Sequence, residues 1–228
     1  MKKIAVIAGT PVDTRMGVEY IENKNSEIDP SLCEPIYLPS AESCDAQYLL
    51  QCGSDEFKRV RMDEIFDAAI QDGIRDYFIY CNSLSGVFDF DNYMAEKSEQ
   101  AGTEINIITP LQVYRKLGAD FNCVGVFAAH NLSAAAIEEA LASANPNIYV
   151  IGSGNMTVVS AIEAGRPPEE IVRDCGLIEM LHYMEASGAE AIILGCTHFP
   201  YLRNALQPHT NLPIVDPADA MFEALRLI

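Results

Sequence analysis

The sequence predicts an α/β fold of two similar lobes, each a parallel sheet flanked by helices. Short apolar runs alternate with helical stripes along all 228 residues, which is typical of parallel sheets. Two of these runs end in a cysteine, one in each half of the chain. We expect a first lobe of residues 1–98 plus 207–228 and a second of 99–206, although sequence identity between the halves is weak.

In the first half, compact apolar runs predict strands, and apolar residues at helical spacing predict helices. The loop 9–14 is rich in turn formers, residues 43–53 fit either a loop or a frayed helix, and Gly73 and Gly102 end helices. The predicted elements are a strand at 4–8, a weak helix at 16–23, a strand at 36–39, a helix at 55–71, a strand at 74–81, a helix at 89–101 and a strand at 104–109.

The second half continues the alternation. Pro110 starts a helix, Gly165 ends one, and the pair Pro167 and Pro168, followed by two glutamates, opens a long helix. The predicted elements are helices at 110–117, 133–141, 157–164, 167–187, 202–206 and 218–227, and strands at 122–128, 148–151, 189–194 and 212–215.

Composition excludes several classes of protein. A formal net charge of −18 repels nucleic acid and anionic membranes, so we expect neither as a partner. No segment is long and apolar enough for a membrane span, and the N-terminus fits a first strand better than an export signal. Seven cysteines without a Cys-x-x-Cys pair support neither a disulfide framework nor a metal site. We expect a cytoplasmic protein with free thiols.

The two strand-end cysteines, Cys81 and Cys196, suggest a specific chemistry. One thiolate can remove a proton from a carbon while the other thiol protonates the opposite face, which inverts a stereocentre without a cofactor. His198 is placed to act as a base or hydrogen-bond partner for Cys196. The other neighbours can donate hydrogen bonds to a substrate: Asn82, Ser83 and Thr197. The remaining cysteines are expected in the core: Cys33, Cys44, Cys52, Cys123 and Cys175.

These motifs resemble a known family. Residues 195–200, Gly-Cys-Thr-His-Phe-Pro, resemble the Gly-Cys-Thr-His-Tyr-Pro signature of glutamate racemases. Residues 81–83, Cys-Asn-Ser, resemble the Cys-Asn-Thr of the aspartate/glutamate racemase superfamily, and the separation of 115 residues (196 − 81) is similar to that of the family. Residues 123–128 and 162–165 resemble it more weakly.

The resemblance implies two lobes related by a pseudo-twofold axis, with the active site in the cleft between them. It implies racemisation of an amino acid by Cys81 and Cys196 without pyridoxal phosphate or metal. It also implies a homodimer, the common state in the family. His198 would assist Cys196. The substrate's carboxylate and amine would be held by Asn82, Ser83 and Thr197.

The sequence departs from the family pattern at positions where the family binds its substrate. In the loop after the first strand, Thr10 could replace a substrate-binding Ser, and Asp13 is either an assisting acid or a turn former. After the second strand, residues 39–42 lack the Arg of aspartate racemases, and Glu163 stands where that group has a Lys. Asn131 could supply a polar contact. The remaining candidate cations for the cleft are Arg15, Arg59, Arg61 and Arg166.

These departures argue against aspartate as the substrate. They leave glutamate, a different amino acid, or a substrate without a second carboxylate. A maleate isomerase also keeps two cysteines and stays open, whereas a decarboxylase of this superfamily needs only one. A non-catalytic protein that binds a small acid is the alternative outside enzymes.

Overall fold

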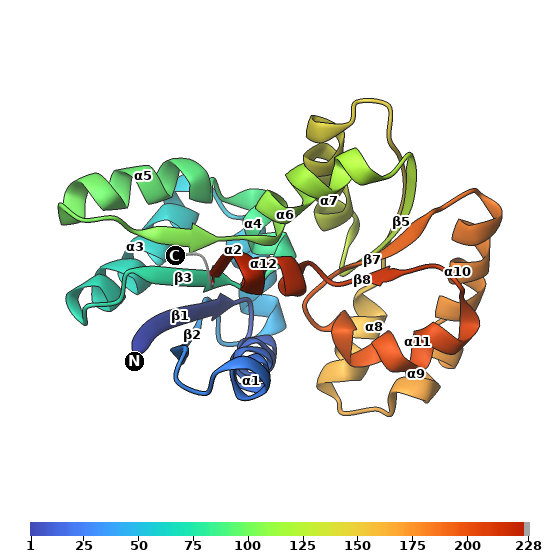
Figure 1. Cartoon of the computed structure of the whole chain (residues 1–228), viewed down its shortest axis with the longest axis horizontal. Helices are drawn as coiled ribbons and strands as arrows, with labels where there is room; N and C mark the ends of the chain where they lie inside the picture. The colour runs from blue at the N-terminus through green and yellow to red at the C-terminus, as the bar shows by residue number, and fades with distance from the viewer. Residues whose placement is uncertain (226–228) are drawn as a thin grey trace. The chain divides into compact units, whose positions relative to one another are not determined.

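The computed structural model describes residues 1–225 and contains two compact units, each with its own sheet (Figure 1). Unit 1 comprises Met1–Pro110 and the C-terminal residues from Met221 onwards. Its four strands are all parallel, in the order β2-β1-β3-β4. They are β1 (Lys2–Ala8), β2 (Cys33–Pro39), β3 (Asp76–Ile79) and β4 (Asn106–Ile108).

The helices of unit 1 cover this sheet, and α1 packs on β1 and β2. Stacked and edge-on aromatic rings fill the core: the Phe66 centroid lies 4.2 Å from that of Tyr77 and 5.0 Å from that of Tyr93. The helices are α1 (Pro11–Ile28), α2 (Cys44–Cys52), α3 (Asp55–Gln71), α4 (Asn82–Val87) and α5 (Phe90–Ala101).

Unit 2, Leu111–Ala220, has a second parallel sheet with the order β6-β5-β7-β8. Each strand has the same place in this order as its counterpart in the first sheet. Helix α7 packs on β6, β5 and β7, and Ile137 and Leu141 are fully buried there. The strands are β5 (Cys123–Ala128), β6 (Tyr149–Gly154), β7 (Ala191–Gly195) and β8 (Ile214–Val215).

Short helices connect the strands of unit 2. These α-helices are α6 (Pro110–Leu117), α7 (Asn131–Ala144), α8 (Met156–Glu163), α9 (Pro168–Asp174), α10 (Leu177–Ala186) and α11 (Arg203–Leu206). The last helix, α12 (Pro217–Leu225), follows β8 and passes from unit 2 into unit 1. Three turns are 3-10 helices: η1 (Gly118–Asp120), η2 (Phe199–Leu202) and η3 (Gln207–His209).

The predicted α/β fold with two similar parallel sheets is confirmed. The units and the predicted lobes differ over residues 99–110 and 207–220. In the first range β4 pairs with β3, and in the second β8 pairs with β7, so each stretch completes a sheet.

Some elements differ from the prediction. The long helix expected over 167–187 is two helices, because Gly176 adopts a left-handed conformation (φ 69°) between α9 and α10. Residues 43–53 form helix α2, and the unpredicted helix α4 starts directly after Cys81. Cys33 is buried as expected, but Cys52 is exposed, which corrects its assignment to the core, and the three others are half-buried. Within residues 1–225, no helix has the length and apolar character needed to cross a membrane.

Candidate functional site

Cys81 lies at the carboxyl end of the unit 1 sheet, between β3 and α4. The Tyr80 N–H donates to Ile7 O at 2.7 Å, so pairing with β1 continues past the end of β3. Cys81 is the N-cap of α4, and its Sγ accepts the Leu84 N–H at 3.5 Å. Cys81 is buried, with 2% of the residue exposed. The local sequence therefore turns a buried strand into a helix with the sulfur at the junction.

Two glutamines from α2 surround this thiol. Gln47 Nε2 donates to Cys81 Sγ at 3.3 Å, and Gln51 Nε2 donates to Ser83 Oγ at 2.7 Å. Ser83 Oγ itself lies 3.4 Å from Cys81 Sγ. Asn82 is buried beside them. The sulfur thus faces amide and hydroxyl groups, which suits a sulfur that carries negative charge.

The loop after β1 is closed by Asp13. Its carboxylate accepts the Gly9 N–H at 3.2 Å, the Thr10 N–H at 2.6 Å and the Thr10 hydroxyl at 3.0 Å. Thr10 caps α1 in return, so the two residues form a capping box, and both are buried. Of the two interpretations of Asp13, the structure shows the turn-forming role. It also shows the Thr10 hydroxyl engaged with that carboxylate.

Cys196 lies at the corresponding place in unit 2, directly after β7. Its Sγ is 3.7 Å from His198 Nδ1, and His198 Nε2 is 3.0 Å from Glu163 Oε1 at the end of α8. The His198 side chain is 4% exposed and that of Glu163 is 22% exposed. Thr197 is buried beside them. If Nε2 carries the hydrogen and donates it to Glu163, Nδ1 presents its lone pair to the thiol.

A buried phenol lies in the same unit as Cys196. Tyr114 is fully buried, and burial raises its pKa well above the usual value, with nearby Asp216 and Cys196 adding to the effect. Asp216 follows β8 and accepts the Ala218 N–H at 3.0 Å. Tyr114 therefore remains a neutral phenol at physiological pH.

The loop after β5 uses its polar residues to start α7. His130 Nδ1 accepts the Ser133 N–H at 3.2 Å, and the Asn131 side-chain oxygen accepts the Gly154 N–H at 3.2 Å. His130 is half-buried, and burial lowers its pKa. Asn131, predicted to contact substrate, thus uses its oxygen to hold β6 to α7. His130 is the N-cap of α7.

The four candidate cations all have partners. Arg59 binds Glu96 and Asp63, and Arg166 binds Asp174. The other two contact the end of β2: Arg15 stacks over Tyr37, and Arg61 Nε donates to Ser40 O at 2.9 Å.

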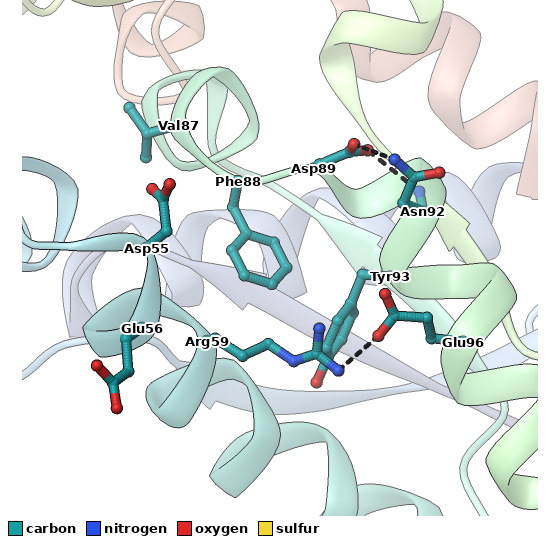
Figure 2. Close-up of a pocket in the computed structure, with 9 residues that line it drawn as sticks. All are labelled: Asp55, Glu56, Arg59, Val87, Phe88, Asp89, Asn92, Tyr93 and Glu96. Atoms are coloured by element: carbon teal, nitrogen blue, oxygen red, sulfur yellow. Dashed lines mark hydrogen bonds and ion pairs between the residues drawn. The ribbon is translucent and has the colours of Figure 1, made fainter.

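A cavity of about 570 Å³ lies elsewhere in unit 1, between the start of α3 and the junction of α4 with α5 (Figure 2). The Phe88 ring points into it, and Arg59 lies over Tyr93 while bonding Glu96. Of its nine lining residues, Arg59 alone was a candidate for the site, as one of the four possible cations. Across the described residues, no three His, Cys, Asp or Glu side chains gather as a metal site would require.

Sequence reasoning missed three polar residues around the thiols. It noted Glu163 only as the residue that stands where aspartate racemases have a Lys, and it did not connect Glu163 with His198. It did not consider Gln47 or Gln51. Glu163 is 35 residues from His198, and Gln47 is 34 residues from Cys81, so no local pattern connects them. The helical reading of 43–53 was the one available signal, because it puts both glutamines on one face.

Comparison with known proteins identifies relatives. A model of the Asp/Glu/Hydantoin racemase family matches residues 105–225. The glutamate racemase of Limosilactobacillus reuteri (strain DSM 20016) is 34% identical over 93 residues, which are 40% of this chain and 33% of that protein. The match thus spans about a third of this relative's length.

Solved structures match nearly the whole chain. The glutamate racemase from Francisella tularensis subsp. tularensis SCHU S4, in complex with D-glutamate, is 21% identical with a TM-score of 0.70, covering 99% of this chain and 81% of that one. An aspartate racemase homologue from Pyrococcus horikoshii OT3 is 16% identical with a TM-score of 0.62, covering 99% and 97%. At these identities the similarity supports the fold.

Proposed function

Because the chain belongs to the Asp/Glu/Hydantoin racemase family, we propose that it racemises an amino acid without a cofactor, using Cys81 and Cys196 as its two bases. One observation carries the proposal. In both sheets the strand at the third place of the order, β3 or β7, leads directly to a buried cysteine. Each thiol also has polar partners, which a cysteine that serves only to fill a core does not require.

In the proposed reaction, one cysteine acts as a thiolate and the other as a thiol. The thiolate uses a lone pair to take the α-proton, so an S–H bond forms and the C–H bond breaks. The electron pair of the C–H bond stays on the α-carbon beside the carboxylate. The thiol then gives its proton to the opposite face of that carbon. The product is the other enantiomer, and the two sulfurs have exchanged protonation states.

The neighbours of each thiol have distinct roles in this proposal. His198 takes the proton from Cys196 or returns it, and Glu163 holds the imidazole in the tautomer that this requires. In unit 1, the hydroxyl and amide groups of Ser83 and Asn82 bind the substrate's polar groups, with Thr197 serving the same purpose in unit 2. Thr10 keeps a supporting role through its bond to Asp13.

Glutamate is the substrate we propose first. The relative from Limosilactobacillus reuteri is a glutamate racemase. The sequence lacks the Arg and the Lys of aspartate racemases at the matching positions, which argues against aspartate. The four arginines that could replace them contact other groups of the protein. Neutral donors would then hold the side-chain carboxylate.

The test follows α-proton exchange in deuterated water by NMR, using both enantiomers of glutamate and aspartate, with maleate and a hydantoin for comparison. We expect exchange and inversion of glutamate by the parent protein. Cys81→Ala and Cys196→Ala should each lose racemisation, and any exchange that remains should affect opposite enantiomers in the two variants. Cys175→Ala, a half-buried cysteine of unit 2, is the matched control.

Racemisation that continues unchanged in either cysteine variant would refute the two-base proposal. Thermal stabilisation of the parent by glutamate without any α-proton exchange would identify a binding protein instead.

A further inference from the structure

The amide of Gln47 occupies the space directly over Cys81 and Gly9. Besides its 3.3 Å bond to Cys81 Sγ, its Nε2 lies only 1.7 Å from the point where a Cβ on residue 9 would stand. The glycine therefore leaves room for this amide, and a side chain at residue 9 would displace it.

Helix α2 is held in place independently of this contact. Gln51 lies one helical turn after Gln47 on the same face, is buried, and donates to Ser83 Oγ at 2.7 Å. The Ser43 hydroxyl caps the helix start by accepting the Ala46 N–H at 3.2 Å. The side chain of Gln47 can therefore change partner while the helix backbone stays where it is.

The position of the amide relates it to the reaction. A carbon that gives its proton to Cys81 must approach the sulfur to about 3–3.5 Å, and Gln47 Nε2 now lies at a similar distance from the same sulfur. The α-carboxylate is bonded to that carbon. An amide moved off the sulfur by the substrate would thus lie beside the carboxylate, with an N–H to donate.

We propose that Gln47 is a substrate-binding residue whose amide N–H passes from Cys81 Sγ to the substrate's α-carboxylate. This inference rests on the proposed racemase function and adds the group that covers the thiol. The carboxylate oxygens gain negative charge when the α-proton leaves, so the hydrogen bond strengthens in the transition state. Its loss should lower kcat more than it raises KM.

Alkylation with iodoacetamide tests whether the Gln47 amide shields Cys81 Sγ, and it does not require an active enzyme. Peptide mass spectrometry separates the labelling of Cys81 from that of Cys196 in the same chain. The labelling of Cys196 serves as the internal reference. Gln47→Ala should speed labelling of Cys81 on the order of tenfold, because reactivity follows exposure of the sulfur. Gly9→Ala should do the same by displacing the amide while keeping Gln47. Leu49→Ala, 66% exposed on the same helix, is the control and should change neither.

Kinetics with D- and L-glutamate test the donor. Gln47→Met keeps the length of the side chain without the N–H, and we expect kcat to fall on the order of 100-fold with a smaller change in KM. A kcat within about threefold of the parent would overturn the role of the amide in the reaction. Equal labelling of Cys81 in the parent, Gln47→Ala and Gly9→Ala would overturn the proposal that the Gln47 amide shields Cys81 Sγ. An inactive parent would contradict the racemase proposal alone, since the labelling still tests the contact.

Discussion

The contact between Glu163 and His198 allows a quantitative prediction. Glu163→Gln keeps the shape of the side chain and removes its charge. In the parent, Glu163 Oε1 lies 3.0 Å from His198 Nε2, and the imidazole is 4% exposed. The variant retains an acceptor oxygen but loses the charge that favours the Nε2–H tautomer and stabilises an imidazolium.

The magnitude follows from the geometry. A hydrogen bond to a charged group contributes about 1.5–3 kcal/mol, and the 22% exposure of the Glu163 side chain places this pair toward the lower end. A loss of about 1.5–2 kcal/mol corresponds to a fall in kcat/KM of about 10–30-fold. Because the equilibrium constant of a racemisation is unity, kcat/KM must fall equally for D- and L-glutamate.

The assay is polarimetric measurement of initial rates from each glutamate enantiomer, beside urea unfolding to confirm an unchanged fold. Glu170→Gln is the matched control, since it removes a half-exposed carboxylate of the same unit that faces Arg166 at 3.9 Å. We expect it to keep the parent kcat/KM. A folded Glu163→Gln variant with kcat/KM within about twofold of the parent would refute the coupling of Glu163 to Cys196 through His198.

Two further predictions concern stability, measured as the free energy of unfolding in urea. Burial lowers the pKa of His130 in the folded protein below its value of about 6.5 in the unfolded chain. The contribution of neutral His130 to stability is therefore complete above that unfolded pKa and is lost as the pH falls. His130→Asn replaces the capping ring nitrogen with a capping oxygen that does not titrate. The variant should therefore lose less stability than the parent between about pH 7 and pH 5, and equal losses would contradict this. Lys97, 4% exposed in its side chain, lies 2.8 Å from Asp63 and 2.5 Å from Asp67, so Lys97→Met should cost about 2 kcal/mol. The exposed Lys3→Met is its control, and an equal effect of both changes would contradict the network.

The elements that the sequence predicted well are those with a complete local signal. The stripe over 55–71 became α3 with the same bounds, and the apolar run before Cys196 became β7. The helix expected over 167–187 was wrong at Gly176, because a glycine inside an apolar stripe does not reveal its φ. Helix α4 has only six residues, too few to show a period.

The α/β class and the two strand-end cysteines could be predicted from the sequence, because period and strand-end chemistry are encoded within a few neighbouring residues. The groups that face each sulfur could not be predicted in this way. Gln47 reaches Cys81 across 34 residues and Glu163 reaches His198 across 35. Such partners meet only once parallel strands bring the ends of separate loops and helices to one edge of a sheet, and that placement follows from packing of the whole unit.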